Sequence, residues 1–235
     1  MATRVAVDPP GPPGEDLAAA YRRLNAAYQQ SLRYAEDVQR LYRQLQRGIY
    51  QSLLGLANAL EAKDPYTRGH SERVSRWSKR LASVLGLPAP EIETIRQAGL
   101  LHDIGKIGVR ETVLRKHGSL DPAEWDEMRR HPTVGAQIVA PFDFFADGAE
   151  IIRHHHERWD GSGYPDGLAG VAIPVGARVV AVTDVFDALT SDRPYRRALD
   201  VKTAIEYLIE QAGRTLDEDV VAAFVGLART EAIAD

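Results

Sequence analysis

Apolar residues recur every seven positions through the first part of the chain, with polar and charged residues between them. Two series of this kind interleave, and together they define the seam of a coiled coil. One series has a serine as its polar member, and the other contains three tyrosines. The pattern predicts a long helix over residues 15–49. The two series are Leu17, Leu24, Ser31, Val38 and Leu45, and Tyr21, Tyr28, Ala35, Tyr42 and Ile49.

Two structures are compatible with this seam. The helix packs on its own domain, or it pairs with the same helix of a second copy. The pattern is longer than an ordinary globular helix, which favours pairing and hence a homodimer through Leu17–Ile49. Ser31 and Ala35 weaken the middle of the seam, and the tyrosine hydroxyls need water or hydrogen-bond partners. The preceding residues, 1–14, are rich in proline and glycine and are expected to be disordered.

After residue 50 the apolar spacing changes to that of shorter helices. The segment 51–64 continues the long helix until Pro65, which disfavours helix in the residue before it. Asp121 followed by proline has the form of a helix N-cap and first turn. Ala177–Val182 is strand-prone, but its continuation into DVFDAL favours a helix. Further helices are expected at 71–87, 90–105, 121–131, 131–141, 148–159, 176–189, 201–212 and 216–228.

These elements predict an all-α domain over residues 50–229, preceded by the tip and the long helix and followed by a tail at 230–235. No internal repeat is visible in the sequence. One long irregular segment, 160–174, interrupts the helices. Long loops in compact domains are often functional.

Composition limits the classes of function. The chain has 235 residues, of which 44% are hydrophobic and 26% charged, as in ordinary globular proteins. Its formal net charge of -4 argues against general binding to nucleic acid or to anionic membranes. There is no cysteine, which excludes thiolate metal sites and disulfides. No apolar run is long enough to span a bilayer, and no signal-peptide core is present at the start. A cytoplasmic protein is therefore expected.

The most informative chemistry lies in the adjacent residues His102 and Asp103 of LLHDIGKIG. They end an apolar helix, where an unpaired polar pair would be costly to bury. Asp184 lies in VVAVTDVFDAL, an otherwise apolar helical segment. No lysine or arginine lies in that segment to pair with a buried carboxylate. Asp187, one turn further on, either supports the site or is a plain exposed acid. The other candidate ligands are His70, His131, His154, His155 and His156.

These candidates outnumber the ligands that one ion can use. Imidazole and carboxylate ligands suit iron, manganese, zinc, nickel or cobalt, among which the sequence does not choose. Two ions that share Asp103 are the economical arrangement. Such a pair binds a bridging hydroxide that attacks phosphorus in line. The expected activity is therefore hydrolysis of a phosphate ester.

Three basic residues are candidates for contact with phosphate. Lys106 follows Asp103 by about one helical turn, so it either faces the same pocket or is a solvated lysine at a helix end. Facing inward, it would stabilise charge on a phosphoryl oxygen. Arg193 and Arg196 follow the Asp184 helix, where they either bind phosphate or form a solvated basic turn.

Several strings together resemble the HD-GYP family, a branch of the HD superfamily of metal-dependent phosphohydrolases. The similarity covers about residues 50–229, and the strings occur in the family's order. The resemblance implies an HD-type helical domain that hydrolyses the bacterial second messenger cyclic di-GMP. The strings are DPYTRGH, HDIGK, HPTVG, HHERWDGSGYP, DVFDAL and DRPYR.

The same resemblance implies roles for individual residues. Lys106 matches the lysine of the family's HDxxK segment, and both Asp103 and Lys106 are expected to act in catalysis. The family pattern uses the two histidines that directly precede ERWDG, which are His155 and His156. His154 is therefore left over as an extra histidine. The expected substrate contacts are Gly163, Tyr164, Pro165, Arg193 and Arg196. The expected metal ligands are His70, His102, Asp103, His131, His155, His156 and Asp184.

One departure from the family pattern predicts the number of metal ions. Some members carry a glutamate four residues before the first histidine, which helps to hold a third metal. This chain has Tyr66 there, and tyrosine is a poor substitute for a bridging carboxylate. We therefore expect two divalent transition-metal ions, with iron or manganese favoured over zinc, nickel or cobalt. The expected product is linear pGpG, and further cleavage to GMP stays open.

Two other functions remain compatible with the sequence. The chain could be a cyclic-dinucleotide sensor or a scaffold that binds diguanylate cyclases (GGDEF proteins) through its coiled coil. The intact ligand set argues against a degenerate site. Alternatively, it is an HD phosphohydrolase for a mononucleotide or for cyclic GMP-AMP. The GYP segment disfavours the mononucleotide but leaves a mixed cyclic dinucleotide open.

Overall fold

The structure is a computed structural model that describes residues 13–62, 69–116, 118–192 and 197–232. Most of the predicted disordered tip, together with Tyr66, Arg193 and Arg196, lies outside these residues. The described part is helical and contains no strand beyond an isolated bridge between Ala212 and Leu216. The prediction of an all-α fold is confirmed. No helix in the described ranges has both the length and the apolar character needed to cross a membrane.

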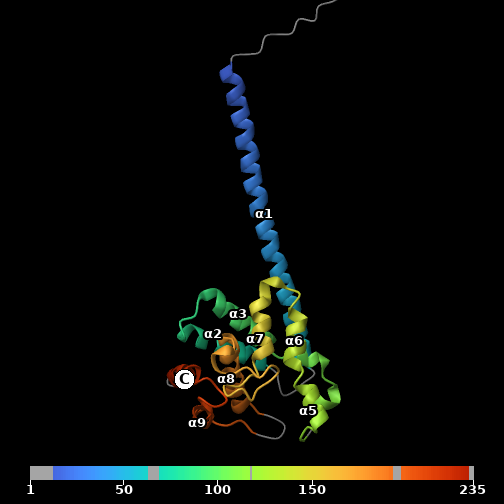
Figure 1. Cartoon of the computed structure of the whole chain (residues 1–235), viewed down its shortest axis with the longest axis vertical. Coiled ribbons are helices and arrows are strands. Elements are labelled where there is room, and N and C mark those ends of the chain that lie inside the picture. The colour runs from blue at the N-terminus through green and yellow to red at the C-terminus, as the bar shows by residue number, and fades with distance from the viewer. Residues whose placement is uncertain (1–12, 63–68, 117, 193–196, 233–235) are drawn as a thin grey trace, which may run out of the picture. The chain divides into compact units, whose positions relative to one another are not determined.

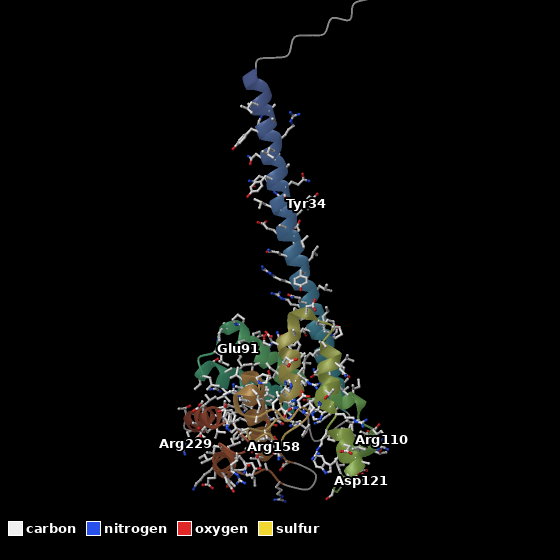
Figure 2. All side chains as sticks on the ribbon, viewed as in Figure 1. Tyr34, Glu91, Arg110, Asp121, Arg158 and Arg229 are labelled. Atoms are coloured by element: carbon white, nitrogen blue, oxygen red, sulfur yellow. The ribbon has the colours of Figure 1, made fainter. Side chains whose placement is uncertain are left out.

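The chain divides into two compact units, residues 1–51 and 52–235. Helix α1 (Pro13–Glu61) supplies the first unit and the start of the second. Within the first unit the apolar seam is exposed, and Leu17 and Val38 keep 73% and 65% of their surface accessible. Figure 2 shows side chains projecting all around this part of α1, Tyr34 among them. The seam therefore has no intramolecular cover within its own unit.

The second unit is a set of short helices joined by turns and loops (Figure 1). The 160–174 segment is irregular apart from one short 3₁₀ helix, as its composition predicts. The elements are α2 (His70–Val84), α3 (Ala89–Leu101), η1 (Ile104–Gly108), α4 (Glu111–Leu114), α5 (Pro122–Met128), α6 (His131–Val139), η2 (Asp143–Phe145), α7 (Ala146–His154), η3 (Gly170–Ala172), α8 (Val175–Thr190), α9 (Val201–Gln211) and α10 (Glu218–Ala232).

The core forms where α2 packs on α3, α8 and α10, and where α6 packs on α7 and η1. Helix α8 is apolar on several faces because neighbours cover it on more than one side. Trp77, Phe186 and Phe224 meet edge to face between α2, α8 and α10, with ring centroids 4.8–5.6 Å apart. This packing holds the helix ends that carry the polar candidates.

Local sequence explains how two of these helices begin and end. Asp121 caps α5 as predicted, because its side chain accepts a hydrogen bond from the Glu124 amide while Glu124 bonds back. The helix predicted over 90–105 ends earlier, at Leu101, and the chain tightens into η1. Gly105 lies so close to the His131 carbonyl that a Cβ atom would collide with it. That approach brings the His102–Asp103 pair next to α6.

Candidate metal centre

The predicted ligands come from five separate stretches of chain, most of them at helix ends. His70 is the first residue of α2 and His131 the first residue of α6. His102 caps the C-terminus of α3, and Asp103 follows directly before η1. His155 and His156 follow the last residue of α7. Asp184 alone lies inside a helix, α8, so its position depends on which face of α8 turns inward.

A first group consists of His70, His102 and Asp184, whose potential ligand atoms lie within 4.8 Å of one another. The His70 Nε2 atom is 3.3 Å from Asp184 Oδ1, and His102 Nε2 is 4.0 Å from the same oxygen. Burial opposes the charge on Asp184, but the hydrogen bond with His70 and the neighbouring histidines hold its pKa well below the usual range. The carboxylate is thus ionised and available to a cation.

A second group consists of His131, His155 and His156, again within 4.8 Å of one another. The Nε2 atoms of His131 and His155 are 3.4 Å apart. Burial lowers the pKa of His131 to about 3 and that of His156 to about 4. Burial also lowers the pKa of His155 well below its ordinary value. All three rings are therefore neutral at pH 7, which is the form that binds metal.

Asp103 lies between the two groups and turns one oxygen toward each. Its Oδ1 is 3.4 Å from His131 Nε2, and its Oδ2 is 3.5 Å from His102 Nε2. Burial opposes its charge, but Lys106 and the surrounding histidines hold the pKa of Asp103 well below its ordinary value. A carboxylate placed in this way can join two cation sites through its two oxygens.

Three of the imidazoles are oriented by hydrogen bonds from Nδ1 to backbone carbonyls. The Nδ1 atom of His102 donates to the Gly99 carbonyl at 2.9 Å, and that of His131 to Met128 at 2.8 Å. His155 Nδ1 donates to the carbonyl of Ile152 at 2.7 Å. Such bonds select the tautomer whose Nε2 lone pair points inward.

His70 is oriented by a carboxylate instead of a carbonyl. Its Nδ1 donates to Asp187 Oδ2 at 2.7 Å, and Arg73 Nε donates to the other oxygen at 2.6 Å. Asp187 is only 3% exposed, so it supports the site and is not a plain surface acid. Burial opposes the charge on His70, but its bonds with Asp184 and Asp187 outweigh burial and raise the pKa of His70 to about 9. Sequence reasoning left the role of Asp187 open and did not identify Arg73. The sequence indicated the role of Asp187 only through its position one helical turn after Asp184.

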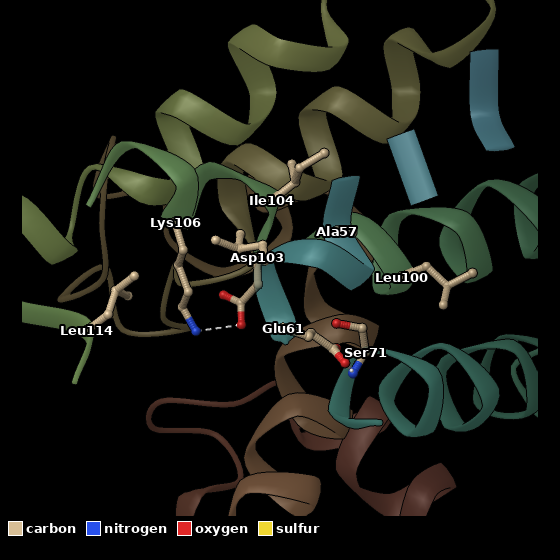
Figure 3. Close-up of a pocket in the computed structure, with 9 residues that line it drawn as sticks. Ala57, Glu61, Ser71, Leu100, Asp103, Ile104, Lys106 and Leu114 are labelled. Carbon is tan, nitrogen blue, oxygen red and sulfur yellow. Dashed lines mark hydrogen bonds and ion pairs between the residues drawn. The ribbon is translucent and has the colours of Figure 1, made fainter. Parts of the chain in front are cut away.

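Lys106 lies against the centre, with its Nζ 2.5 Å from Asp103 Oδ2 (Figure 3). Both residues line a small pocket at the end of α1. Glu61, from α1, lies in the same pocket beside Ser71. The remaining walls are apolar and are formed by Ala57, Leu60, Leu100, Ile104 and Leu114.

Glu61 is a residue that sequence reasoning missed. One of its carboxylate oxygens accepts the Gly69 amide at 3.1 Å, and the other accepts the Ser71 amide at 2.9 Å. These two amides flank His70 in the chain. Glu61 therefore fixes the backbone that carries the first histidine of the centre. The pairing joins residues eight and ten positions apart, so no short-range pattern indicates it.

The donor set fits divalent cations. The Nε2 atom of His102 is buried and has no hydrogen-bond partner within the described ranges. A buried nitrogen lone pair without a partner is costly, and a metal ion would satisfy it. The neutral imidazoles of the His131, His155 and His156 group and the ionised carboxylates, without any thiolate, suit first-row divalent metals. The residues present therefore fit a metal centre around Asp103.

The GYP segment lies against this centre. The Tyr164 ring packs on His156, with centroids 5.0 Å apart, and the Tyr164–Pro165 bond is cis. Gly163 passes so close to the backbone of Glu157 that a Cβ atom would collide with it. The buried Glu157 carboxylate accepts the amides of Asp166, Gly167 and Leu168, an anchor that sequence reasoning also missed. The position of Glu157 directly after the three histidines was the available indication of this role in the sequence.

His154 points away from the centre. Its Nδ1 donates to the Glu150 carbonyl, and its Nε2 lies 2.9 Å from Asp166 Oδ2. Asp166 in turn accepts two hydrogen bonds from Arg153. His154 forms a further candidate group with Glu157 and Asp166. The carboxylates of that group are already engaged by Arg153 and by backbone amides, so it does not resemble an open metal site.

Comparison with known proteins identifies the family to which this fold belongs. A family model described as HD domain matches residues 55–220. The chain belongs to the HD domain family. The predicted relation to the HD phosphohydrolases is thereby confirmed, and their metal dependence agrees with the histidine and aspartate groups.

The similar proteins include enzymes that act on cyclic dinucleotides. The chain is 45% identical over 186 residues to the cyclic di-GMP phosphodiesterase response regulator RpfG of Xanthomonas campestris, covering 78% of this chain and 49% of that protein. It is 34% identical over 209 residues to 3'3'-cGAMP-specific phosphodiesterase 2 of Vibrio cholerae, covering 88% and 40%. The chain thus spans about half the length, or less, of these relatives.

A solved structure has the same fold. The crystal structure of a cyclic GMP-AMP-specific phosphodiesterase of V. cholerae (V-cGAP3) matches with a TM-score of 0.63. The match covers 79% of this chain and 50% of that one at 18% sequence identity. At that identity the likeness concerns the fold of the helical domain.

Proposed function

We propose that the protein is a metal-dependent phosphodiesterase that hydrolyses cyclic di-GMP to linear pGpG. The observation that carries this proposal is the position of Asp103 between two groups of three ligands each. The relative most similar among those described above, RpfG, is a cyclic di-GMP phosphodiesterase. The proposed ligands are His70, His102 and Asp184 for one ion, and His131, His155 and His156 for the other, with Asp103 shared.

Two bound divalent ions would activate water and neutralise charge at phosphorus. Asp103 would hold the two sites at a constant separation. The Nδ1 bonds of the histidines keep their Nε2 atoms aimed inward, so that little reorganisation accompanies the reaction. Asp187 and Arg73 do the same for His70. We propose that the ions are iron or manganese. Zinc, nickel and cobalt are the other metals that this set of ligands suits.

Lys106 would supply positive charge where the phosphoryl oxygens develop negative charge. Its Nζ contacts Asp103, so it lies within reach of a phosphate at the centre. Tyr164, with Gly163 and Pro165, would form one wall of the substrate site through its packing on His156. Arg193 and Arg196 stay predicted phosphate contacts. We propose two ions because this sequence has Tyr66 at the position where a third ion would need a carboxylate.

The direct test uses protein purified with and without oxygen and loaded with Mn²⁺ or Fe²⁺. Incubation with cyclic di-GMP followed by chromatography that resolves pGpG from GMP should show pGpG as the first product. Metal analysis should give two ions per chain. Three ions would contradict the two-ion proposal, and binding of cyclic di-GMP without turnover would favour the sensor or scaffold function.

A second substrate is favoured by the comparisons. Two of the similar proteins are specific for cyclic GMP-AMP. The same assay with cyclic GMP-AMP in place of cyclic di-GMP separates the two substrates by their kcat/KM ratio. The exposed seam of α1 supports a homodimer, and it is also the surface on which a diguanylate cyclase partner would bind in the scaffold function.

A further inference from the structure

A hollow of about 430 Å³ opens beside the candidate metal centre. His156 and Tyr164 line it, and so does Val185 of α8, which follows Asp184 directly. A volume of this size is in the range of sites for small organic ligands. The other lining residues come from α5, α8, α9 and the turns after α5, α7 and α9, and include Trp125, Arg129, Arg158, Tyr207 and Gln211.

The hollow is lined by aromatic rings and guanidinium groups. Trp125 and Tyr207 keep 47% and 41% of their surface exposed, so part of each side chain is open to a ligand. The Arg129 guanidinium carbon lies 6.0 Å from the Trp125 ring centroid and 5.7 Å from that of Tyr164. These are contacts of a cation with ring π-systems, and the guanidinium carries five N–H donors.

Two arginines line the hollow. Neither Arg129 nor Arg158 forms an ion pair with a carboxylate in the part of the chain that the structure describes. Glu157 is the acidic residue among the lining residues, and its oxygens already accept backbone amides. The hollow therefore offers hydrogen-bond donors and stacking surfaces to a ligand that carries acceptors.

We propose that this hollow is a subsite for a guanine base, with Arg129 as its specificity-determining residue. The proposal rests on the proposed function, in which a phosphodiester lies at the metal centre. Guanine presents two acceptors, O6 and N7, on one edge, which match a guanidinium fork. Adenine places an amino donor where guanine has O6, so the same fork would not accept it. Trp125 and Tyr207 provide stacking for the base, as aromatic side chains do for unpaired bases.

The test compares Arg129→Ala and Arg129→Lys with the wild type and with a control, Arg130→Ala. Arg130 is the adjacent exposed arginine and does not line the hollow. Turnover is measured with cyclic di-GMP and with bis(p-nitrophenyl) phosphate, a phosphodiester that carries no base. Binding of guanosine and of adenosine is measured in parallel by saturation-transfer NMR.

Both Arg129 variants should raise KM for cyclic di-GMP roughly tenfold or more, since the lysine lacks the fork. They should leave the base-free ester unaffected and abolish the preference for guanosine over adenosine. Arg130→Ala should match the wild type in every measurement. Unchanged KM and nucleoside preference, or equal losses on both esters, would overturn the subsite while leaving the proposed function intact. A wild type that binds guanosine through Arg129 but cleaves only the base-free ester would keep the subsite and refute the proposed function.

Discussion

At the scale of single residues, the centre depends on one carboxylate and on the orientation of the rings around it. Asp103 faces both ligand groups, and no other carboxylate among the described residues pairs with both His102 and His131. The carbonyl bonds to Nδ1 set the tautomers of three histidines. Loss of the Asp103 carboxylate would therefore change both halves of the centre.

Asp103→Asn should abolish both metal loading and hydrolysis. The amide keeps the size of the side chain but presents one oxygen instead of two, and it carries no charge to join two cations. Metal content by mass spectrometry and turnover of cyclic di-GMP give the two readouts. Asp126→Asn, an exposed acid on α5, is the matched control and should retain both. Turnover that survived in Asp103→Asn would remove the shared-carboxylate arrangement.

Lys106→Met should keep the metal ions but lower kcat by roughly 10²-fold, the usual effect of losing one group that stabilises transition-state charge. Methionine retains much of the apolar stem that lines the pocket in Figure 3. The measurements are metal content and steady-state kinetics. If the variant loses metal instead, Lys106 acts by keeping Asp103 in place and not on the phosphate.

At the scale of elements, helix ends are the parts that carry the chemistry. Helices α2 and α6 begin with a proposed ligand, and α3 and α7 end directly before proposed ligands. The end of α1 takes part through Glu61, which holds the amides on either side of His70. Because those amides belong to the first turn of α2 and its N-cap, a carboxylate is favourable there in charge as well.

Glu61→Ala should lower the metal content from two ions toward one. The lost ion is the one assigned to His70, because that residue's backbone would no longer be held, whereas the His131 group does not contact Glu61. Glu61→Gln retains one acceptor oxygen and should lose less metal. Titration with Mn²⁺ followed by electron paramagnetic resonance distinguishes one weak site from two strong ones. Glu36→Ala, an exposed acid on α1, should behave like the wild type. Equal loss of both ions would indicate general unfolding.

At the scale of the whole molecule, the chain combines a folded helical domain with an exposed apolar seam. The accessible residues of the first unit include leucines, tyrosines and a valine in heptad register. An exposed apolar seam of this kind favours association. The positions between the seam residues carry arginines and acids, which keep the opposite face of the helix in water.

Deletion of residues 1–48 should convert a dimer into a monomer, as measured by light scattering. The point variant Leu24→Glu places a charge in the seam and should have the same effect, because burying an unpaired charge is costly. Arg33→Glu lies outside both heptad series and serves as the control, which should remain dimeric. A truncated protein that stayed dimeric would locate the interface in the helical domain.

Much of the fold could be predicted because its signals are local. Apolar spacing located the helices, and Asp121 with Pro122 located the start of α5. Leu101 shows the limit of this reasoning. The residues after it read as helix, but the close approach of Gly105 to α6 changes them to 3₁₀ geometry, and such an approach is a tertiary contact.

The sequence alone determined which residue types were available for the centre and which helices carried them. Apolar periodicity and the high cost of burying unpaired polar groups are properties of the chain itself. Only the tertiary structure decided that Asp103 faces both groups and that Asp187, Arg73 and Glu61 hold His70. The contact between His70 and Asp187 joins residues 117 positions apart in the chain. The packing of α2 against α8 creates that contact, and no short segment of sequence specifies it.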